Sequence, residues 1–114
     1  MRADGIVEID FSDTLEIDVK EAKEMLAATG LLTEGKKVLV LNVAGSLTTA
    51  TTAAREFAAS VDASQFTLAE AYVVSNLAQK IVGNFYVNFH KPQVPTKIFT
   101  NAEEAVKWLK SLNL

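Results

Sequence analysis

Hydroxyl-bearing residues and one arginine gather where the sequence predicts the start of a helix. The hydroxyl residues are Ser46, Thr48, Thr49, Thr51 and Thr52, and Arg55 follows one turn into the helix. Free main-chain amides and the positive end of the helix dipole attract anions at such a start. Thr48, Thr51, Thr52 and Arg55 are therefore candidate ligand-binding residues for an anionic group. The structural alternative is that Thr48 is only an N-cap and that Arg55 only pairs with an acid.

A second predicted helix start carries similar chemistry. Ser75 and Asn76 follow a strand, and Lys80 lies one turn later. Parallel sheets bind ligands outside the carboxyl ends of their strands, so this start and the Thr48–Arg55 start are expected to line one crevice. The alternative is ordinary helix capping by Ser75 and Asn76.

The sequence offers little for catalysis or metal binding. It contains no cysteine and a single histidine, His90, which excludes thiolate metal sites and mechanisms that need two histidines. His90 closes an apolar helix, where the helix dipole stabilises a cationic imidazole. No Gly-x-Ser-x-Gly, P-loop or Gly-x-Gly-x-x-Gly motif is present. We therefore expect no catalytic residue, no metal, no cofactor and no enzymatic activity.

The elements that must position these residues alternate between strand and helix. Residues 5–18 alternate polar and apolar side chains, as in a strand with one wet face, and a bend is predicted at Ser12-Asp13 before a short extended piece. Val38–Leu41 is apolar throughout, which is typical of a central strand with two dry faces.

The remaining periodicities complete one α/β domain over residues 1–114. Further strands are expected at Phe66–Val74 and Thr96–Phe99, and helices at Val19–Thr29, Thr49–Ser60, Asn76–Phe89 and after Asn101. Asp18 and Glu21 have the spacing of a capping box, and Gly30 is expected to stop the first helix. Regular strand–helix alternation predicts a mostly parallel, four-stranded sheet with four helices.

The predicted helix Asn76–Phe89 is apolar on more than one face. Its apolar residues are Leu77, Ile81, Val82, Phe85, Tyr86 and Phe89, too many for a single buried stripe. Phe85, Tyr86 and Phe89 are candidate interface residues, for a homodimer contact or for lining a lipid-like ligand. The alternative is that the core of the monomer covers them all.

Charge and hydropathy limit the classes of partner. The net charge of −3 and the pI of about 5.1 argue against nucleic acid. Between Ala71 and Ala102, by contrast, lysines occur without any carboxylate, which suits an anionic group. The longest unbroken apolar runs, such as Val38–Leu41, have four residues, far fewer than the ~20 residues that a membrane helix needs. The amino terminus is acidic and does not resemble a secretory signal. We expect a cytoplasmic protein without a transmembrane segment.

The order of elements resembles the SpoIIAA-like fold of STAS domains, found in anti-sigma-factor antagonists and sulfate-transporter modules. Small uncharacterised bacterial STAS-like and Sec14-like proteins are similar in two stretches, TTAAREFAAS and YVVSNLAQKIVGNFYVNFHKPQVPTKIFTNAEEAVKWL. The resemblance spans about Ile6 to Leu112. It implies a SpoIIAA-like superhelix of four strand–helix turns in a bacterial protein.

The resemblance also implies a test of one known site. Antagonist STAS proteins carry an Asp-Ser-Ser-Gly turn in which a partner kinase phosphorylates one serine. Here Thr51 or Thr52 stands at the serine, but Ala50 replaces the acid and Ala53 replaces the glycine.

Three hypotheses of function follow from the sequence. The first is a non-catalytic regulatory or protein-interaction module that self-associates through the third helix. The second is a carrier or sensor of a small anionic, lipid-like ligand, with its tail near Phe85 and its head at the helix starts. The third is a phospho-acceptor switch at Thr51 or Thr52.

Overall fold

The computed structural model describes residues 2–11 and 14–114, so the predicted bend at Ser12-Asp13 lies outside the described part. The strands are β1 (Val7–Phe11), β2 (Glu16–Ile17), β3 (Val38–Ala44), β4 (Thr49–Ala50), β5 (Thr67–Val73) and β6 (Thr96–Phe99). The helices are α1 (Val19–Leu32), α2 (Thr52–Ala58), α3 (Leu77–Phe85) and α4 (Ala102–Ser111), with short turns η1 (Asp62–Ser64) and η2 (Tyr86–His90).

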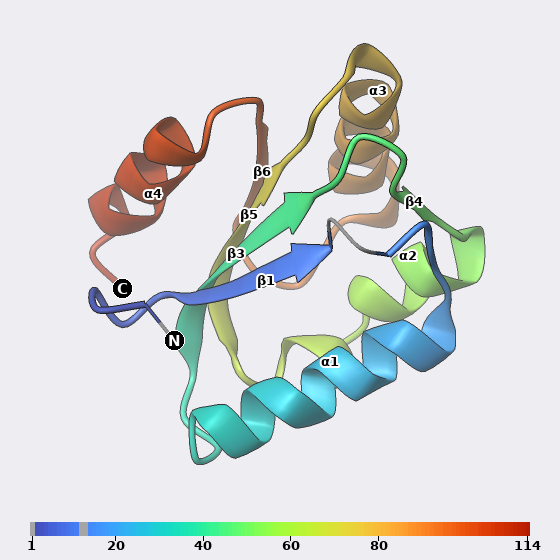
Figure 1. Cartoon of the computed structure of the whole chain (residues 1–114). Helices are drawn as coiled ribbons and strands as arrows, with labels where there is room; N and C mark the ends of the chain where they lie inside the picture. Colours follow the sequence, from blue (N-terminus) through green and yellow to red (C-terminus); the bar gives the residue numbers. More distant parts are fainter. Residues whose placement is uncertain (1, 12–13) are drawn as a thin grey trace.

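The main sheet is parallel throughout and has the order β1-β3-β5-β6 (Figure 1). Its strands follow one another in sequence order across the sheet. Right-handed crossovers that advance in one direction place every crossover helix on the same face. The predicted central position of Val38–Leu41 is confirmed, because β3 lies between parallel neighbours on both sides.

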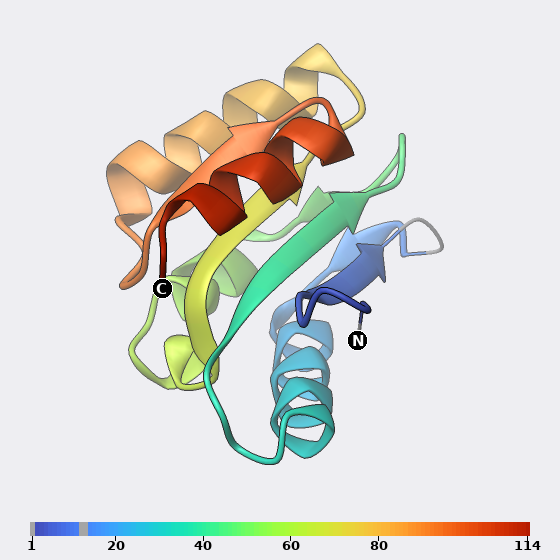
Figure 2. The ribbon, with the colours of Figure 1, turned by 90° about the vertical axis from the view of Figure 1, so that its left-hand side faces the viewer.

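The two faces of the sheet are covered differently. The crossover helices α1, α2 and α3 lie on one face, and α4, which follows β6, packs on the other (Figures 1 and 2). The packed core forms on the α4 side, where buried alanines of β5 let the helix approach closely. This core comprises Ile6, Leu41, Ala69, Ala71, Ala105 and Leu109. The α/β architecture predicted from the sequence, with a parallel four-stranded sheet and four helices, is confirmed.

The end of α1 differs from the prediction. Asp18 and Glu21 form the expected capping box, but the helix continues through Gly30 to Leu32. Gly30 is needed for close packing, since a Cβ there would lie 2.6 Å from the Phe66 ring. The chain reverses later, where Glu34 and Gly35 adopt positive φ angles of 55° and 79°.

The start of the second helix also differs. Thr49 and Ala50 form β4, which pairs in parallel with the short extended piece β2. The helix α2 therefore starts at Thr52, and Thr51, not Thr48, is its N-cap. The helix is shifted because β2 supplies main-chain partners that the sequence pattern alone does not reveal.

The third helix ends in a wider turn. Asn76 caps α3 as expected, and η2 is a single π-helical turn that ends at Lys91 in the left-handed conformation (φ 52°). Neither α3 nor any other helix in the described part of the chain is both long and apolar enough to cross a membrane.

The packed α4 side should carry much of the stability. Replacing Leu109, which is fully buried, with alanine removes contacts that the tight core cannot refill, so we expect a loss of about 2–5 kcal/mol. Leu31→Ala, at a side chain 83% exposed, should change stability by less than about 0.5 kcal/mol. Urea unfolding monitored by Trp108 fluorescence measures both, and equal losses would contradict the position of the core.

Candidate functional site: a cavity between the sheet and three helices

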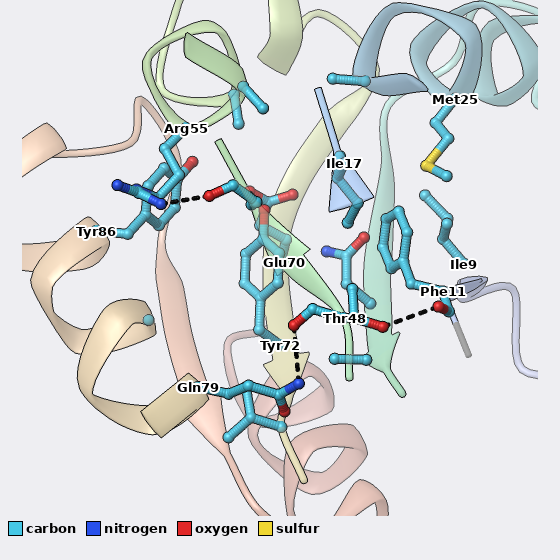
Figure 3. Close-up of a pocket in the computed structure, with 18 of the residues that line it drawn as sticks. Ile9, Phe11, Ile17, Met25, Thr48, Arg55, Glu70, Tyr72, Gln79 and Tyr86 are labelled. Carbon is cyan, nitrogen blue, oxygen red and sulfur yellow. Dashed lines mark hydrogen bonds between the residues drawn. The ribbon is translucent and has the colours of Figure 1, made fainter. Parts of the chain in front are cut away.

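A cavity of about 330 Å³ lies between the sheet and the helices α1, α2 and α3. This volume is at the small end of the range for small-molecule sites. Its wall is mainly apolar where β1 faces α1, with Ile9, Phe11, Met25 and Leu26 among the lining residues. Figure 3 shows Ile9, Phe11 and Met25 on one side of the cavity, and Arg55 and Tyr86 on the other.

The sheet contributes polar side chains to the floor of the cavity. Glu70 and Tyr72 are two residues apart on β5 and so point to the same face. Asn42 is the register partner of Tyr72 on β3. The Tyr72 hydroxyl donates a hydrogen bond of 3.1 Å to Glu70 Oε1. Polar groups are thus placed in the middle of a parallel sheet, where apolar side chains are the rule.

Two further polar side chains approach from the helices. Tyr86 in η2 is buried, and its ring meets the Tyr72 ring edge-on at 6.0 Å between centroids. Arg55 in α2 is fixed by donation from Nη1 to the Ala50 carbonyl and from Nη2 to Thr52 Oγ1 at 3.2 Å. Its guanidinium is therefore held at the cavity by its own helix start.

Three buried polar atoms at the cavity lack hydrogen-bond partners among the described residues. They are Asn42 Nδ2, Arg55 Nε and the Tyr86 hydroxyl. Buried polar groups are normally paired, and each unpaired one costs about 1–3 kcal/mol. All three belong to residues that line one cavity, so unpaired polar atoms gather there.

The carboxyl group of Glu70 has an unusual environment. Burial raises its pKa to about 7, against the lowering effects of the Tyr72 hydroxyl and the Asn42 amide. The Asn42 amide lowers the pKa of Glu70 from nearby, although Asn42 Nδ2 forms no hydrogen bond with it. Burial and the nearby Glu70 in turn raise the pKa values of Tyr72 and Tyr86, so both phenols stay protonated. The cavity therefore contains a carboxyl group that changes charge near neutral pH.

Of the four residues predicted at the first helix start, Thr48 and Arg55 line the cavity, whereas Thr51 and Thr52 do not. Thr48 is buried and lines the cavity, where its hydroxyl donates to the Phe11 carbonyl at 3.0 Å and accepts from the Gly45 amide. Thr51 caps α2 and donates to Asp18 at 2.9 Å, and Thr52 is exposed. Arg55 lines the cavity and pairs with no acid in the described part of the chain.

The structure brings the second helix start close to the first, but its polar groups are used to join loops. Ser75 donates to the Ala44 carbonyl and Asn76 to the Ser46 carbonyl, at 3.1 and 2.9 Å. Gln79 then donates to the carbonyls of Gly45 and Thr48. Ser75, Asn76 and Lys80 border a hollow beyond the strand ends and do not line the cavity, so the two helix starts do not line one crevice together.

The predicted interface residues also separate. Phe85 and Phe89 are 48% and 69% exposed and stack at 4.9 Å between ring centroids. Tyr86 is buried and lines the cavity, so it does not share an exposed surface with Phe85 and Phe89. The reason is helical geometry, because neighbouring residues of a helix point to different sides.

His90 and the acidic residues form no evident metal site. Within residues 2–11 and 14–114, no group of three or more His, Cys, Asp or Glu side chains is arranged to hold a metal ion. His90 packs instead among Phe85, Tyr86 and Phe89, with ring centroids 5.4–5.8 Å from its own. This position fits the predicted role at the end of a helix.

Sequence reasoning missed Asn42, Glu70 and Tyr72, which form the floor of the site. The signal was a polar residue inside an otherwise apolar strand. Asn42 directly follows Val38–Leu41, and Glu70 stands between Ala69 and Ala71. Such residues are expensive to bury, so their presence in central strands is informative.

The raised pKa of Glu70 predicts a specific pH dependence of stability. The folded protein keeps a proton on Glu70 up to about pH 7, whereas the unfolded chain releases it near pH 4.5. The stabilisation is therefore fully present below pH 4.5 and is lost as pH rises to about 7. Relative to Glu70→Gln, the free energy of unfolding of the wild type should fall by up to roughly 3 kcal/mol between pH 4.5 and about pH 7.

Denaturant unfolding at several pH values measures this difference. Glu56→Gln, at an exposed position of α2, is the matched control and should follow the wild type at every pH. A Glu70→Gln profile parallel to that of the wild type would show that Glu70 ionises normally.

Comparison with known proteins gives a family but no activity. No curated protein and no solved structure matches the chain significantly. One family model, described as a domain of unknown function (DUF7793), matches residues 1–113. Because this match spans nearly the whole sequence, the chain belongs to the DUF7793 domain family.

Proposed function

We propose that this chain is a non-catalytic module of STAS-like fold that binds a small amphipathic molecule inside the cavity between its sheet and α1–α3. One observation carries the proposal: three buried polar atoms without partners in the described part of the chain share a cavity that is otherwise mostly apolar. This combination is typical of ligand sites, where a few polar groups fix orientation and apolar walls supply affinity.

The energetics favour an occupied cavity. Each unpaired polar atom costs about 1–3 kcal/mol, and a ligand that accepts hydrogen bonds removes that cost. Apolar wall residues such as Phe11 and Met25 gain contacts that an empty cavity lacks. The methionine also suits a variable ligand, because its flexible thioether adapts to different shapes.

The proposed ligand position differs from that expected from the sequence. Phe85 is half exposed and does not line the cavity, so it is not part of the wall that would hold an apolar tail. The tail is placed instead between β1 and α1, and the polar end near Arg55 and Tyr86 (Figure 3). Of the predicted anion-binding residues, Thr48 and Arg55 line this site.

Filling the cavity should abolish binding without unfolding the protein. Ala22 lies on α1 and lines the cavity, so Ala22→Leu places a side chain where the ligand would lie. Native mass spectrometry of protein purified from its own host should show a retained small molecule on the wild type and none on this variant. Stability should be unchanged or higher, because the new side chain fills an existing void.

The matched control is Ala27→Leu, the same substitution on the exposed side of the same helix. It should retain the small molecule as the wild type does. Equal retention by Ala22→Leu and Ala27→Leu would contradict ligand binding in this cavity.

A second candidate function, self-association, rests on a different observation. Leu77, Ile81, Phe85 and Phe89 form an exposed apolar stripe along α3 and η2. Stripes of this kind are common at contacts between protein chains. The regulatory or interaction role expected from the resemblance to STAS domains would use this surface, with a homodimer as the simplest form.

A charge within the stripe tests self-association. Ile81→Lys should convert a dimer into a monomer by placing an ammonium group in the contact. Val61→Lys introduces the same charge at an exposed apolar residue outside the stripe and should leave the dimer intact. Size-exclusion chromatography with light scattering measures both, and a wild type that stays monomeric at high concentration would exclude this candidate.

The phospho-acceptor hypothesis stays a prediction without structural support. The Thr51 hydroxyl is engaged on both sides, by the Ala54 amide and by Asp18, and Thr52 accepts from Arg55. A kinase would have to open the start of α2 to reach Thr51.

A further inference from the structure

We propose that the cavity recognises the carboxylate of an amphipathic acid, and that this acid binds together with one proton from solvent, which resides on Glu70. The inference rests on the proposed function and deepens it by naming the class of ligand. It starts from the kind of hydrogen-bonding groups that the cavity leaves unpaired.

The unpaired groups are donors. Asn42 Nδ2 and Arg55 Nε can only donate hydrogen bonds, and the Tyr86 hydroxyl can donate as well. A carboxylate has two oxygens with about four acceptor positions, so it has enough acceptors for three donors. A hydroxyl or an amine offers too few acceptors for this set.

The charges around the cavity also favour an anion. Arg55 and Glu70 are the charged residues among the described residues that line it. The helix α1 contributes only uncharged lining residues. A protonated Glu70 leaves Arg55 as the single net charge, which attracts a carboxylate. An ammonium group would instead approach Arg55 and leave its Nε unpaired.

The groups that face Glu70 explain why a proton must accompany the acid. Tyr72 on the same strand and Tyr86 on η2 remain neutral, and Arg55 approaches from α2. On β6, Ile98 lines the cavity, so the adjacent Lys97 lies on the opposite face, where its ammonium sits over the Phe99 ring. His90 on η2 packs beside Tyr86, with 5.8 Å between the two ring centroids, and does not line the cavity.

Two carboxylates in one low-dielectric cavity cannot both stay ionised at low cost. Burial already raises the pKa of Glu70 to about 7 in the free protein. A bound carboxylate raises it further, so the complex holds the proton more firmly than the free protein. The proton is taken from water as the acid enters, and no covalent bond in the ligand changes.

The sign of the pH dependence follows. At pH 6 most free protein already carries the proton, whereas at pH 8 about one molecule in ten does. Affinity for an acid should therefore be about tenfold weaker at pH 8 than at pH 6. Affinity for an alcohol or an amine of the same length should not weaken in this way.

The experiment is titration calorimetry of the full chain with octanoate, octan-1-ol and octylamine at pH 6 and pH 8. We expect octanoate to bind most tightly at pH 6 and to lose about tenfold at pH 8. Glu70→Gln, which is neutral at both pH values, should bind octanoate equally at pH 6 and pH 8. Glu56→Gln should keep the pH dependence of the wild type.

A second measurement does not depend on the folding of any variant. Titrations of the wild type at pH 7.5 in buffers of different ionisation enthalpy report proton uptake directly. We expect about three-quarters of a proton per octanoate bound, because about a quarter of the free protein already carries the proton at this pH. No uptake, or equal affinity at both pH values, would overturn the inference.

The outcomes separate this inference from the proposed function. Tighter binding of octan-1-ol or octylamine than of octanoate overturns the recognition of an acid but leaves the cavity as a ligand site. If none of the three compounds binds at millimolar concentration and the purified protein retains no small molecule, the proposed function fails as well.

Discussion

The parallel pairing of β3 with β1 on one side and β5 on the other organises the rest of the molecule. A strand with two parallel neighbours is dry on both faces, so both faces of the sheet must be covered. Because the strands advance across the sheet in sequence order, the crossover helices α1, α2 and α3 all cover one face. The other face is covered by α4, which packs against β3, β5 and β6.

Both faces of the sheet are covered, but they are packed differently. On the α4 side, small residues such as Ala69 and Ala71 let Leu109 lie against the sheet without a gap. On the crossover side, three helices arch over Asn42, Glu70 and Tyr72 and leave a cavity. A tightly packed face supplies stability, so the opposite face can tolerate unpaired polar atoms that would otherwise be eliminated. The packed face thus stabilises the fold, and the opposite face contains the cavity.

The sequence predicted what depends on local pattern. The apolar run Val38–Leu41 identified the central strand, and the capping residues Asp18, Asn76 and Asn101 begin helices as expected. The predictions were wrong where contacts between residues far apart in the sequence determine where a helix or strand begins or ends. Gly30 lies inside a helix, where the Phe66 ring leaves no room for a larger residue, and Thr49 joins a strand because β2 lies beside it.

The site was predicted only in part, for the same reason. Arg55 and Thr48 were chosen for their chemistry at a helix start, and both do line the cavity. Asn42 and Glu70 were hidden inside strands that read as apolar, and nothing in a strand's local pattern says which face becomes hollow. Tyr86 shows the converse problem, since an apolar helix does not reveal which of its aromatic residues turns inward.

The aromatic residues provide the most direct measurement of the central claim that the cavity holds a ligand. The chain has two tyrosines, Tyr72 and Tyr86, which both line the cavity, and one tryptophan, Trp108, which packs on the α4 side. Isotope-filtered NMR of ring-labelled protein purified with its ligand should show nuclear Overhauser contacts from ligand protons to both tyrosine rings and none to Trp108. Contacts to Trp108, or none to either tyrosine, would contradict the account.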